Sequence, residues 1–494
     1  MSTRELGRPA PVVAIVGAGF GGIGLAMRLT RARIHSFTIF ERAESLGGTW
    51  RDNTYPGAAC DIPSHLYSFS LEPHPDWDRA YAGQPEILRY LERCAAKYRL
   101  HQHIRFGTEV RGARFDERRN VWTLDLSDGS TFEATVLVTA CGQLTRPVLP
   151  DVPGRDSFDG PAFHSARWRH DVDLTGKRVA VIGTGASAVQ IVPELAPRAA
   201  TLVLFQRSAP YVIPKPDRAY HAAEKRLFRA LPLVQRINRA IAYAVHELRF
   251  VAFGYSRAAM KPSRAAFARF LRRQIADPVL RQKLTPDYEM GCKRIMISND
   301  YYPALARENV EVVTDPIDRV TPAGVVTKDG RERPFDALVY ATGFAATGFL
   351  VPMTVTGRAG VTLQDAWRDG AEAYLGITVS GFPNFFMLYG PNTNLGHNSI
   401  VFMLEAQIAY VMDAIETLAR GTCARLEIRP DVQAAFNRRL QQKLGASVWA
   451  RGCTSWYLDA AGKNTVNWPD FTLDYRRRTR KLNLQDYERW TTAS

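Results

Sequence analysis

Two glycine-rich turns of one type, far apart in the chain, constrain the fold more than any other feature. The first has the sequence GAGFGG and begins at Gly17, and the second has the sequence GTGASA and begins at Gly183. An acidic residue, Glu41, lies 24 positions after Gly17, and a basic residue, Arg207, lies 24 positions after Gly183. The equal spacing predicts two copies of one structural unit, and the opposite charges predict that the copies bind different ligands.

Each turn lies between an apolar, β-branched segment and a segment with helical character, and a second apolar segment follows. The segments are 12–16, 22–29 and 36–41 in the first copy and 179–182, 187–192 and 201–205 in the second. Strand, glycine turn, helix and strand in this order are typical of a dinucleotide-binding βαβ unit. The glycines let the backbone approach a pyrophosphate at the positive N-terminus of the helix. We therefore predict an α/β protein with two Rossmann-like dinucleotide domains.

The two charged residues distinguish the ligands. Glu41 can accept hydrogen bonds from the hydroxyl groups of an unphosphorylated ribose, as in FAD or NAD. Arg207 has no acceptor atom, but its guanidinium suits a 2′-phosphate, so the second site is expected to bind NADPH. The alternatives are an ordinary glycine-rich turn at either position and a solvated surface charge at Arg207.

Length and composition are those of a globular protein. The chain has 494 residues, 46% hydrophobic and 23% charged, which is enough for two or three domains. No apolar run has the length of a membrane span, and the N-terminal sequence MSTREL does not read as a secretion signal, so we expect a cytoplasmic protein. The six cysteines form no CxxC or CxxxxC pair, which argues against a metal site and against the disulfide reductases that bind two dinucleotides.

Positive charge is concentrated in one region. The net charge is +15, and the excess lies between Arg218 and Lys283, where apolar residues recur at helical spacing. The simplest interpretation is a set of amphipathic helices with solvated basic faces. The alternatives are attraction of anionic NADPH and weak contact with a membrane surface. No motif supports a nucleic-acid partner.

Three further motifs narrow the function: FxGxxxHxxxW from Phe158 to Trp168, GGxWxxxxYPGxxxD from Gly47 to Asp61, and GCKRI from Gly291. With ATGF from Ala341, they make almost the whole chain resemble the class B flavin monooxygenases, most closely the type I Baeyer–Villiger monooxygenases. One residue departs from that pattern. Arg169 follows the fingerprint tryptophan where the family usually has Pro or Asp, and N- and S-oxygenating relatives have a basic residue there.

The resemblance implies an NADPH- and O2-dependent oxidation of a ketone to an ester or lactone through a flavin C4a-peroxide. Arg294 matches the family's active-site arginine, which holds the peroxide anion and then the oxyanion of the adduct, because arginine keeps its proton. Asp61 matches the acidic partner that positions this arginine. His164 and Trp168 are interpreted as conformational linkers rather than catalysts.

The resemblance and the turns together imply the cofactor-binding residues. Lys293, Arg207 and Ser208 are expected to bind the 2′-phosphate of NADPH, and Trp456 matches a mobile tryptophan near cofactor and substrate. The full expected set is Gly17, Gly19, Phe20, Gly22, Glu41, Gly48, Thr49, Trp50, Asp61, Tyr67, Val110, Gly183, Thr184, Gly185, Ser187, Ala188, Arg207, Ser208, Lys293 and Trp456.

Domain boundaries follow from two strands that end in glycine, at 135–142 and 336–343, and from a proline-rich linker at 147–153. A helix is expected from Ile400, capped by Asn398 or Ser399, with its N-terminus facing the flavin. The expected division is a discontinuous FAD-binding domain (1–148 and 378–494), an NADPH-binding domain (149–214 and 287–377) and a helical insertion (215–286).

Three other functions remain open from the sequence: an N- or S-oxygenating flavin monooxygenase, an NADPH-dependent flavin reductase or electron carrier, and a non-catalytic nucleotide-binding module. The expected partners are a small-molecule ketone and O2, and the expected state is a monomer or homodimer. No motif identifies the ketone.

Overall fold

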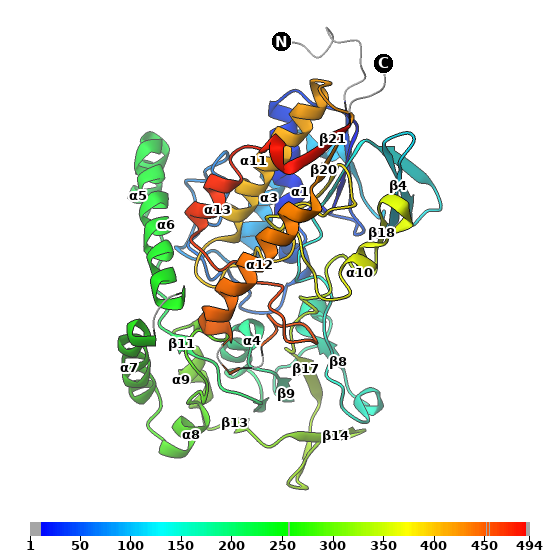
Figure 1. Ribbon diagram of the computed structural model, residues 1–494. Coiled ribbons are helices and arrows are strands. Elements are labelled where there is room, and N and C mark those ends of the chain that lie inside the picture. Colours follow the sequence, from blue (N-terminus) through cyan, green and yellow to red (C-terminus); the bar gives the residue numbers. More distant parts are fainter. Residues whose placement is uncertain (1–10, 255–256, 451, 454, 491–494) are drawn as a thin grey trace.

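The computed structural model describes residues 11–254, 257–450, 452–453 and 455–490. Two five-stranded parallel sheets organise the chain, with strand orders β19-β7-β1-β2-β3 and β13-β10-β9-β17-β8. The unit around the first sheet occupies the upper half of the molecule, and the unit around the second occupies the lower half (Figure 1). The α/β fold with two Rossmann-like units is therefore confirmed.

The first unit is built around β1, which pairs with β2 on one side and β7 on the other. Val13, Ala14 and Ile15 are fully buried and Val16 is partly buried, because helices and a second sheet cover both faces. Its main elements are β1 (Val13–Val16), α1 (Phe20–Arg31), β2 (Phe37–Phe40), α2 (Thr49–Asp52), α3 (Gln84–Lys97), β3 (Ile104–Arg105), β7 (Val136–Thr139), β19 (Phe385–Met387), α11 (Ile400–Ala419), β20 (Arg425–Ile428), α12 (Pro430–Ala446), α13 (Thr472–Arg478) and β21 (Tyr487–Trp490).

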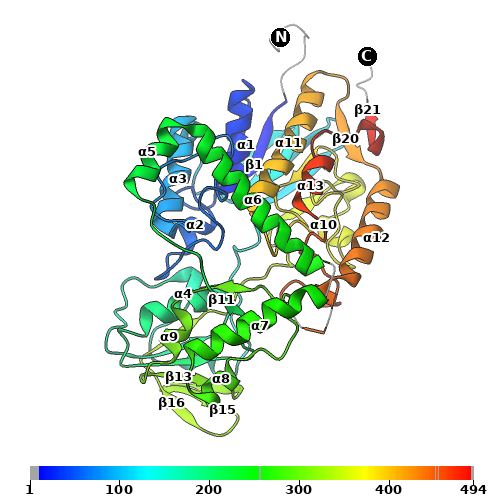
Figure 2. The ribbon, with the colours of Figure 1, turned by 90° about the vertical axis from the view of Figure 1, so that its left-hand side faces the viewer.

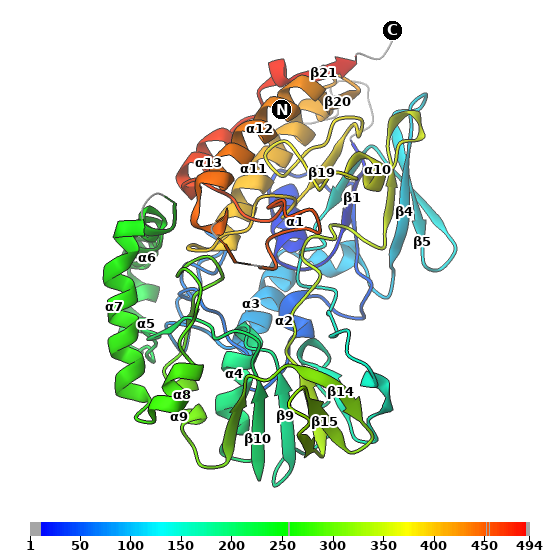
Figure 3. The same cartoon turned by 60° about the horizontal axis from the view of Figure 1, so that its bottom comes forward.

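The second unit repeats this arrangement, with β9 between β10 and β17 (Figure 3). The strand before each glycine turn is thus the third of five in its sheet, as expected for two copies of one unit. Its elements are β8 (Ala162–His164), β9 (Arg178–Ile182), α4 (Ala186–Leu195), β10 (Thr201–Phe205), β11 (Val212–Ile213), β12 (Met296–Ile297), α9 (Tyr301–Leu305), β13 (Val310–Val313), β14 (Ile317–Thr321), β15 (Gly324–Thr327), β16 (Glu332–Pro334) and β17 (Ala337–Tyr340).

The boundary expected at residue 377 is too late. Strand β18 (Thr354–Thr356) pairs with β4 (Val110–Asp116), which continues into β5 (Val121–Leu126) and β6 (Thr131–Ala134). Val355 is fully buried in the same apolar cluster as β4 and β5. The chain therefore returns to the first unit soon after β17, and the short α10 (Leu363–Ala366) lies there as well.

Four helices lie within the expected insertion: α5 (Ala222–Ala230), α6 (Pro232–Gly254), α7 (Arg257–Gln274) and α8 (Pro278–Lys283). Helices α5, α6 and α7 line one side of the molecule and face the viewer in Figure 2. Phe267 and Leu271 of α7 are buried in the core of the second unit, whereas Leu227 of α5 and Leu233 of α6 are exposed. Among the described residues, no helix is both long and apolar enough to cross a bilayer.

Candidate active site

The two glycine turns have the same backbone geometry. Gly17 and Gly183 have φ angles of +107° and +111°, in the region that favours glycine. A Cβ atom at Gly17 would lie 2.7 Å from the Ala140 carbonyl oxygen, and one at Gly183 would lie 2.4 Å from that of Ala341. The turns therefore pack against the strand ends that were expected to close each unit. A Cβ at Gly22 would lie 1.9 Å from the Gly17 carbonyl oxygen, so a larger residue at position 22 would collide with the turn.

Both turns present an open helix N-terminus. Helix α1 starts after Gly19 and helix α4 after Gly185, and no side chain caps either helix. Nothing lies within 4 Å of a Cβ built on Gly185. The free backbone N–H groups and the positive end of each helix suit a pyrophosphate.

An elongated cavity runs from the first turn through the first unit. Nine of the expected residues line it: Gly17, Gly19, Phe20, Glu41, Gly48, Thr49, Trp50, Tyr67 and Val110. Ile400 and Leu404, from the first turns of α11, line it as well. The helix from Ile400 is confirmed, although its N-cap, Ser399, makes no side-chain cap and donates instead to the Leu66 carbonyl. A glycine turn, a buried carboxylate and a helix N-terminus along one cavity fit FAD.

Glu41 lies at the end of this cavity with most of its hydrogen-bonding capacity used. It accepts from the backbone N–H groups of Ala18 (2.9 Å) and Ala43 (3.1 Å) and from Arg51 Nη1 (2.9 Å). A carboxylate can accept about four hydrogen bonds, so about one position remains for a ribose hydroxyl. Arg51 was not expected in the site, although it lies inside the second motif.

The residues expected to read the 2′-phosphate converge beside the second turn. Lys293 Nζ donates to Ser208 Oγ (2.9 Å), and Thr184 Oγ1 donates to the Ser208 carbonyl (2.9 Å). Burial and the positive charge of Arg207 lower the pKa of Lys293. Arg207 is exposed, and within the described chain it forms no salt bridge. Two cations that are close enough to influence each other fit a phosphate group.

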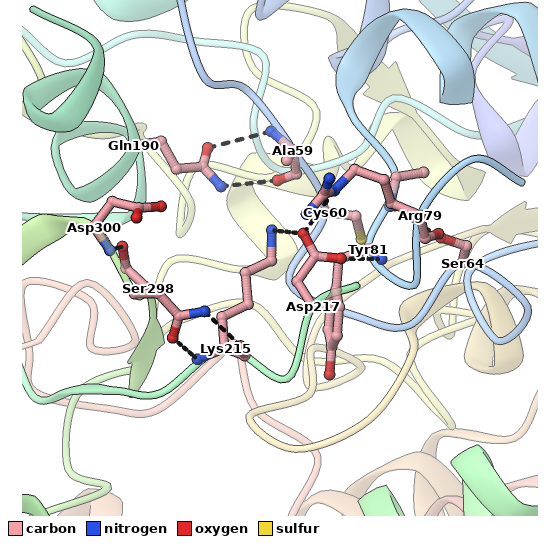
Figure 4. A network of polar contacts seen from close by, with 12 residues as sticks. Ala59, Cys60, Ser64, Arg79, Tyr81, Gln190, Lys215, Asp217, Ser298 and Asp300 are labelled. Atoms are coloured by element: carbon pink, nitrogen blue, oxygen red, sulfur yellow. Dashed lines mark hydrogen bonds and ion pairs between the residues drawn. The ribbon is translucent and has the colours of Figure 1, made fainter. Parts of the chain in front are cut away.

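The motif from Gly47 to Asp61, which lies in the first unit, contacts helix α4 of the second unit. Gln190 accepts from the Tyr55 hydroxyl (2.9 Å), and its amide donates to the Ala59 carbonyl (2.9 Å; Figure 4). A Cβ on Gly57 would lie 2.7 Å from the Gln190 carbonyl oxygen. The expected cofactor residue Ser187 also contacts Tyr55, whereas Ala188 is buried in the core below the helix. This motif therefore positions the two units relative to each other.

Asp61, at the end of that motif, forms an ion pair with Arg294 of the second unit. Arg294 donates to Asp61 Oδ2 from both Nε (3.0 Å) and Nη2 (2.5 Å). The attraction of Asp61 raises the pKa of Arg294, so this guanidinium stays charged at every physiological pH. Among the described residues, Nη1 has only a long contact of 3.5 Å with the Leu395 carbonyl. The pair holds a permanent cation with donor capacity to spare.

Tyr457 was missed by the sequence reasoning. It is almost fully buried, and it is close enough to Arg294 and Asp61 for their charges to influence its pKa. Burial raises that pKa to about 12, so the hydroxyl stays protonated. Within the described part of the chain, this hydroxyl has no hydrogen-bond partner. Its neighbour Trp456, expected near cofactor and substrate, is 38% exposed and lies outside the first-unit cavity.

A disulfide between Cys292 and Cys453 lies next to these residues. It joins the residue before Lys293 to the segment that carries Trp456 and Tyr457. The two cysteines are 161 positions apart, so no local spacing signalled the bond. No group of three or more metal-ligating side chains occurs among the residues that the structure describes.

The fingerprint between the units packs against the end of β17. His164 lies edge-to-face with Phe344 at 5.6 Å, and Trp168 lies edge-to-face with Phe163 at 5.2 Å. Arg169 forms an exposed ion pair with Asp171 and does not line the first-unit cavity. The one residue that favoured N- or S-oxygenation therefore lies at the surface.

Comparison with known proteins agrees with this site. Residues 10–240 match the flavin-binding monooxygenase-like family, which defines the class. A Baeyer–Villiger monooxygenase of Pseudomonas aeruginosa is 48% identical over 97% of this chain and 92% of its own length, and one of Streptomyces coelicolor is 46% identical over 96% and 92%. The chain belongs to the Baeyer–Villiger monooxygenases.

Solved structures support the same assignment. An oxidised steroid monooxygenase bound to NADP has a TM-score of 0.88 at 34% identity, and covers 98% of this chain and all of its own. A closed cyclohexanone monooxygenase has a TM-score of 0.89 at 29% identity, with coverage of 98% and 99%.

Replacement of Arg207 tests the 2′-phosphate site. We expect Arg207→Ala to weaken binding of NADP+ by about 1.5–3 kcal/mol, because a charge-assisted hydrogen bond is lost, and to leave NAD+ binding nearly unchanged. Calorimetry on the FAD-loaded protein measures both. Arg319→Ala, which removes an exposed ion pair on β14, is the matched control. Equal losses for the two nucleotides would show that Arg207 does not read the phosphate.

Proposed function

We propose that this Baeyer–Villiger monooxygenase oxidises a ketone to an ester or lactone at the Asp61–Arg294 pair, with NADPH and O2 as co-substrates. The observation that carries the proposal is a permanently charged guanidinium, held by one carboxylate oxygen between the two nucleotide units. FAD, held by the cavity residues around Gly17 and Glu41, would supply the hydride acceptor for NADPH and the reactivity toward O2. The residues of the chain would then direct the reaction toward oxidation of the ketone.

Arg294 stabilises negative charge during the reaction. Its Nε and Nη2 are directed to Asp61, so Nη1 remains to donate to an oxygen that becomes anionic as the ketone carbonyl is attacked. Asp61 fixes the orientation of the guanidinium through the charge-assisted pair. A lysine cannot make this arrangement, because it has a single nitrogen in place of the planar fork.

The remaining expected residues bind the cofactors in this proposal. The cavity residues around Gly17 and Glu41 hold FAD, and the N-terminus of α11 stabilises negative charge on its ring system. Arg207, Ser208 and Lys293 hold the 2′-phosphate of NADPH beside the second turn. We assign residues 215–286 to a helical insertion, and we assign the segment around β18 to the FAD-binding unit.

Replacement of Arg294 tests the catalytic role. We expect Arg294→Ala to bind FAD and to be reduced by NADPH, but to form ester at least about a hundredfold more slowly, because a preorganised charge is lost. Anaerobic stopped-flow reduction and product analysis with a panel of ketones measure the two steps. Arg178→Ala, which removes an exposed ion pair with Asp336, is the control. Ester formation at the wild-type rate by Arg294→Ala would refute the proposal.

We propose that the Tyr457 hydroxyl, which has no partner among the described residues, donates a hydrogen bond to the substrate beside this pair. We expect Tyr457→Phe to lower kcat for ester formation roughly two- to tenfold, the value of one hydrogen bond, and to leave FAD reduction unchanged. Tyr301→Phe is the matched control, because Tyr301 also has a buried hydroxyl without a partner among the described residues, but lies in the core of the second unit. Equal rates for Tyr457→Phe and the wild type would exclude this role.

A further inference from the structure

We propose that the outer face of α5, α6 and α7 binds the surface of a membrane that contains anionic lipids. Helix α6 has 23 residues, and aliphatic side chains recur along its outer face at intervals of three and four positions. The five are Leu233 (67% exposed), Ile237 (50%), Ile241 (59%), Val245 (48%) and Leu248 (68%). We call these five residues the aliphatic stripe. At 1.5 Å per residue, the stripe is about 22 Å long.

Helix α6 uses polar side chains for part of its contact with the protein, whereas its aliphatic stripe stays exposed. Gln235 donates to the His74 carbonyl (2.7 Å), and Arg239 donates to the carbonyls of His65 and Ser68 (both 2.7 Å). A surface helix normally turns its apolar stripe to the core and its polar residues to water. The aliphatic stripe therefore needs another explanation than core packing.

The buried Glu247 strengthens this attachment of α6. It accepts hydrogen bonds from Asn398 Nδ2 (2.8 Å), Thr472 Oγ1 (2.7 Å) and the Leu473 N–H (3.1 Å). Burial alone would raise the pKa of Glu247, but the nearby His397 and these hydrogen bonds lower it to about 2. The charged carboxylate thus helps to hold α6 on the side of the molecule that faces the viewer in Figure 2, with the stripe exposed.

Charge identifies the kind of partner. Residues 222–274 contain twelve Lys and Arg but only two Glu, so this segment carries +10 of the chain's net +15. Neither Glu weakens the positive face, because Glu224 pairs with Arg218 and Glu247 is buried. The exposed cations are Arg226, Arg229, Arg236, Arg249, Lys261, Arg264, Arg269, Arg272 and Arg273. The face is both strongly basic and aliphatic.

An anionic lipid surface suits both properties. Aliphatic side chains enter the interfacial layer, and arginines and lysines contact the acidic headgroups. A second copy of this chain would bring one group of exposed cations against another, which opposes association. A nucleic acid would match the charge but would leave the aliphatic stripe without a partner. The anionic membrane surface is therefore the occupant that the charge and the stripe favour together.

The test uses the full-length, FAD-loaded protein and vesicles of phosphatidylcholine, with or without phosphatidylglycerol. We expect co-sedimentation with the anionic vesicles, weaker binding to the neutral ones, and weaker binding at high salt because charges are screened. The triple variant Leu233→Gln, Ile241→Gln, Leu248→Gln is expected to lower the partition coefficient about tenfold or more. Its activity on a water-soluble ketone is expected to stay unchanged, which shows that it is folded.

A second triple variant, Leu149→Gln, Val279→Gln, Val361→Gln, removes exposed aliphatic residues that lie outside α6 and is expected to bind vesicles normally. The proposal is overturned if the wild type does not bind anionic vesicles, or if both triple variants bind equally well. It is also overturned if the stripe variant abolishes a dimer of the wild type in sedimentation experiments while vesicle binding is absent, because the occupant would then be a second copy.

Discussion

The ion pair between Asp61 and Arg294 is the interaction on which the rest of the site depends. Its two residues come from different nucleotide units, so the pair exists only when both units are correctly placed. On one side, Gln190 of α4 forms hydrogen bonds with Tyr55 and Ala59, in the motif that ends at Asp61. On the other side, the disulfide between Cys292 and Cys453 holds the segment in which Lys293 and Arg294 directly follow Cys292. The proposed catalytic cation is therefore held by contacts on both sides of the interface.

The two nucleotide units have the same glycine turn but carry opposite charges at the end of the strand that follows it. Glycine is required at both turns because a side chain would collide with the end of a neighbouring strand. What differs is the residue at the end of the next strand, where Glu41 accepts hydrogen bonds and Arg207 offers positive charge. One fold thus separates a cavity for FAD from a site for NADPH without any large difference in backbone.

The parts that could be predicted from the sequence are those encoded locally. The turns, the strands beside them, the helix from Ile400 and the motifs that contain Asp61 and Arg294 all have short-range patterns. The parts that were missed depend on contacts between distant segments. The pairing of β18 with β4, the Cys292–Cys453 bond and the position of Tyr457 leave no periodic signal in the chain. Helical spacing identified α6, but spacing alone could not show which of its faces points to water.

The central claim is that Asp61 acts by holding Arg294, and a double-mutant cycle tests it most directly. The rate of ester formation is measured after NADPH reduction in Asp61→Ala, Arg294→Ala and the double variant. Because Asp61 has no role once the guanidinium is absent, the account predicts that the double variant is no slower than Arg294→Ala alone. Losses that multiply in the double variant would contradict the account, since the two residues would then act independently.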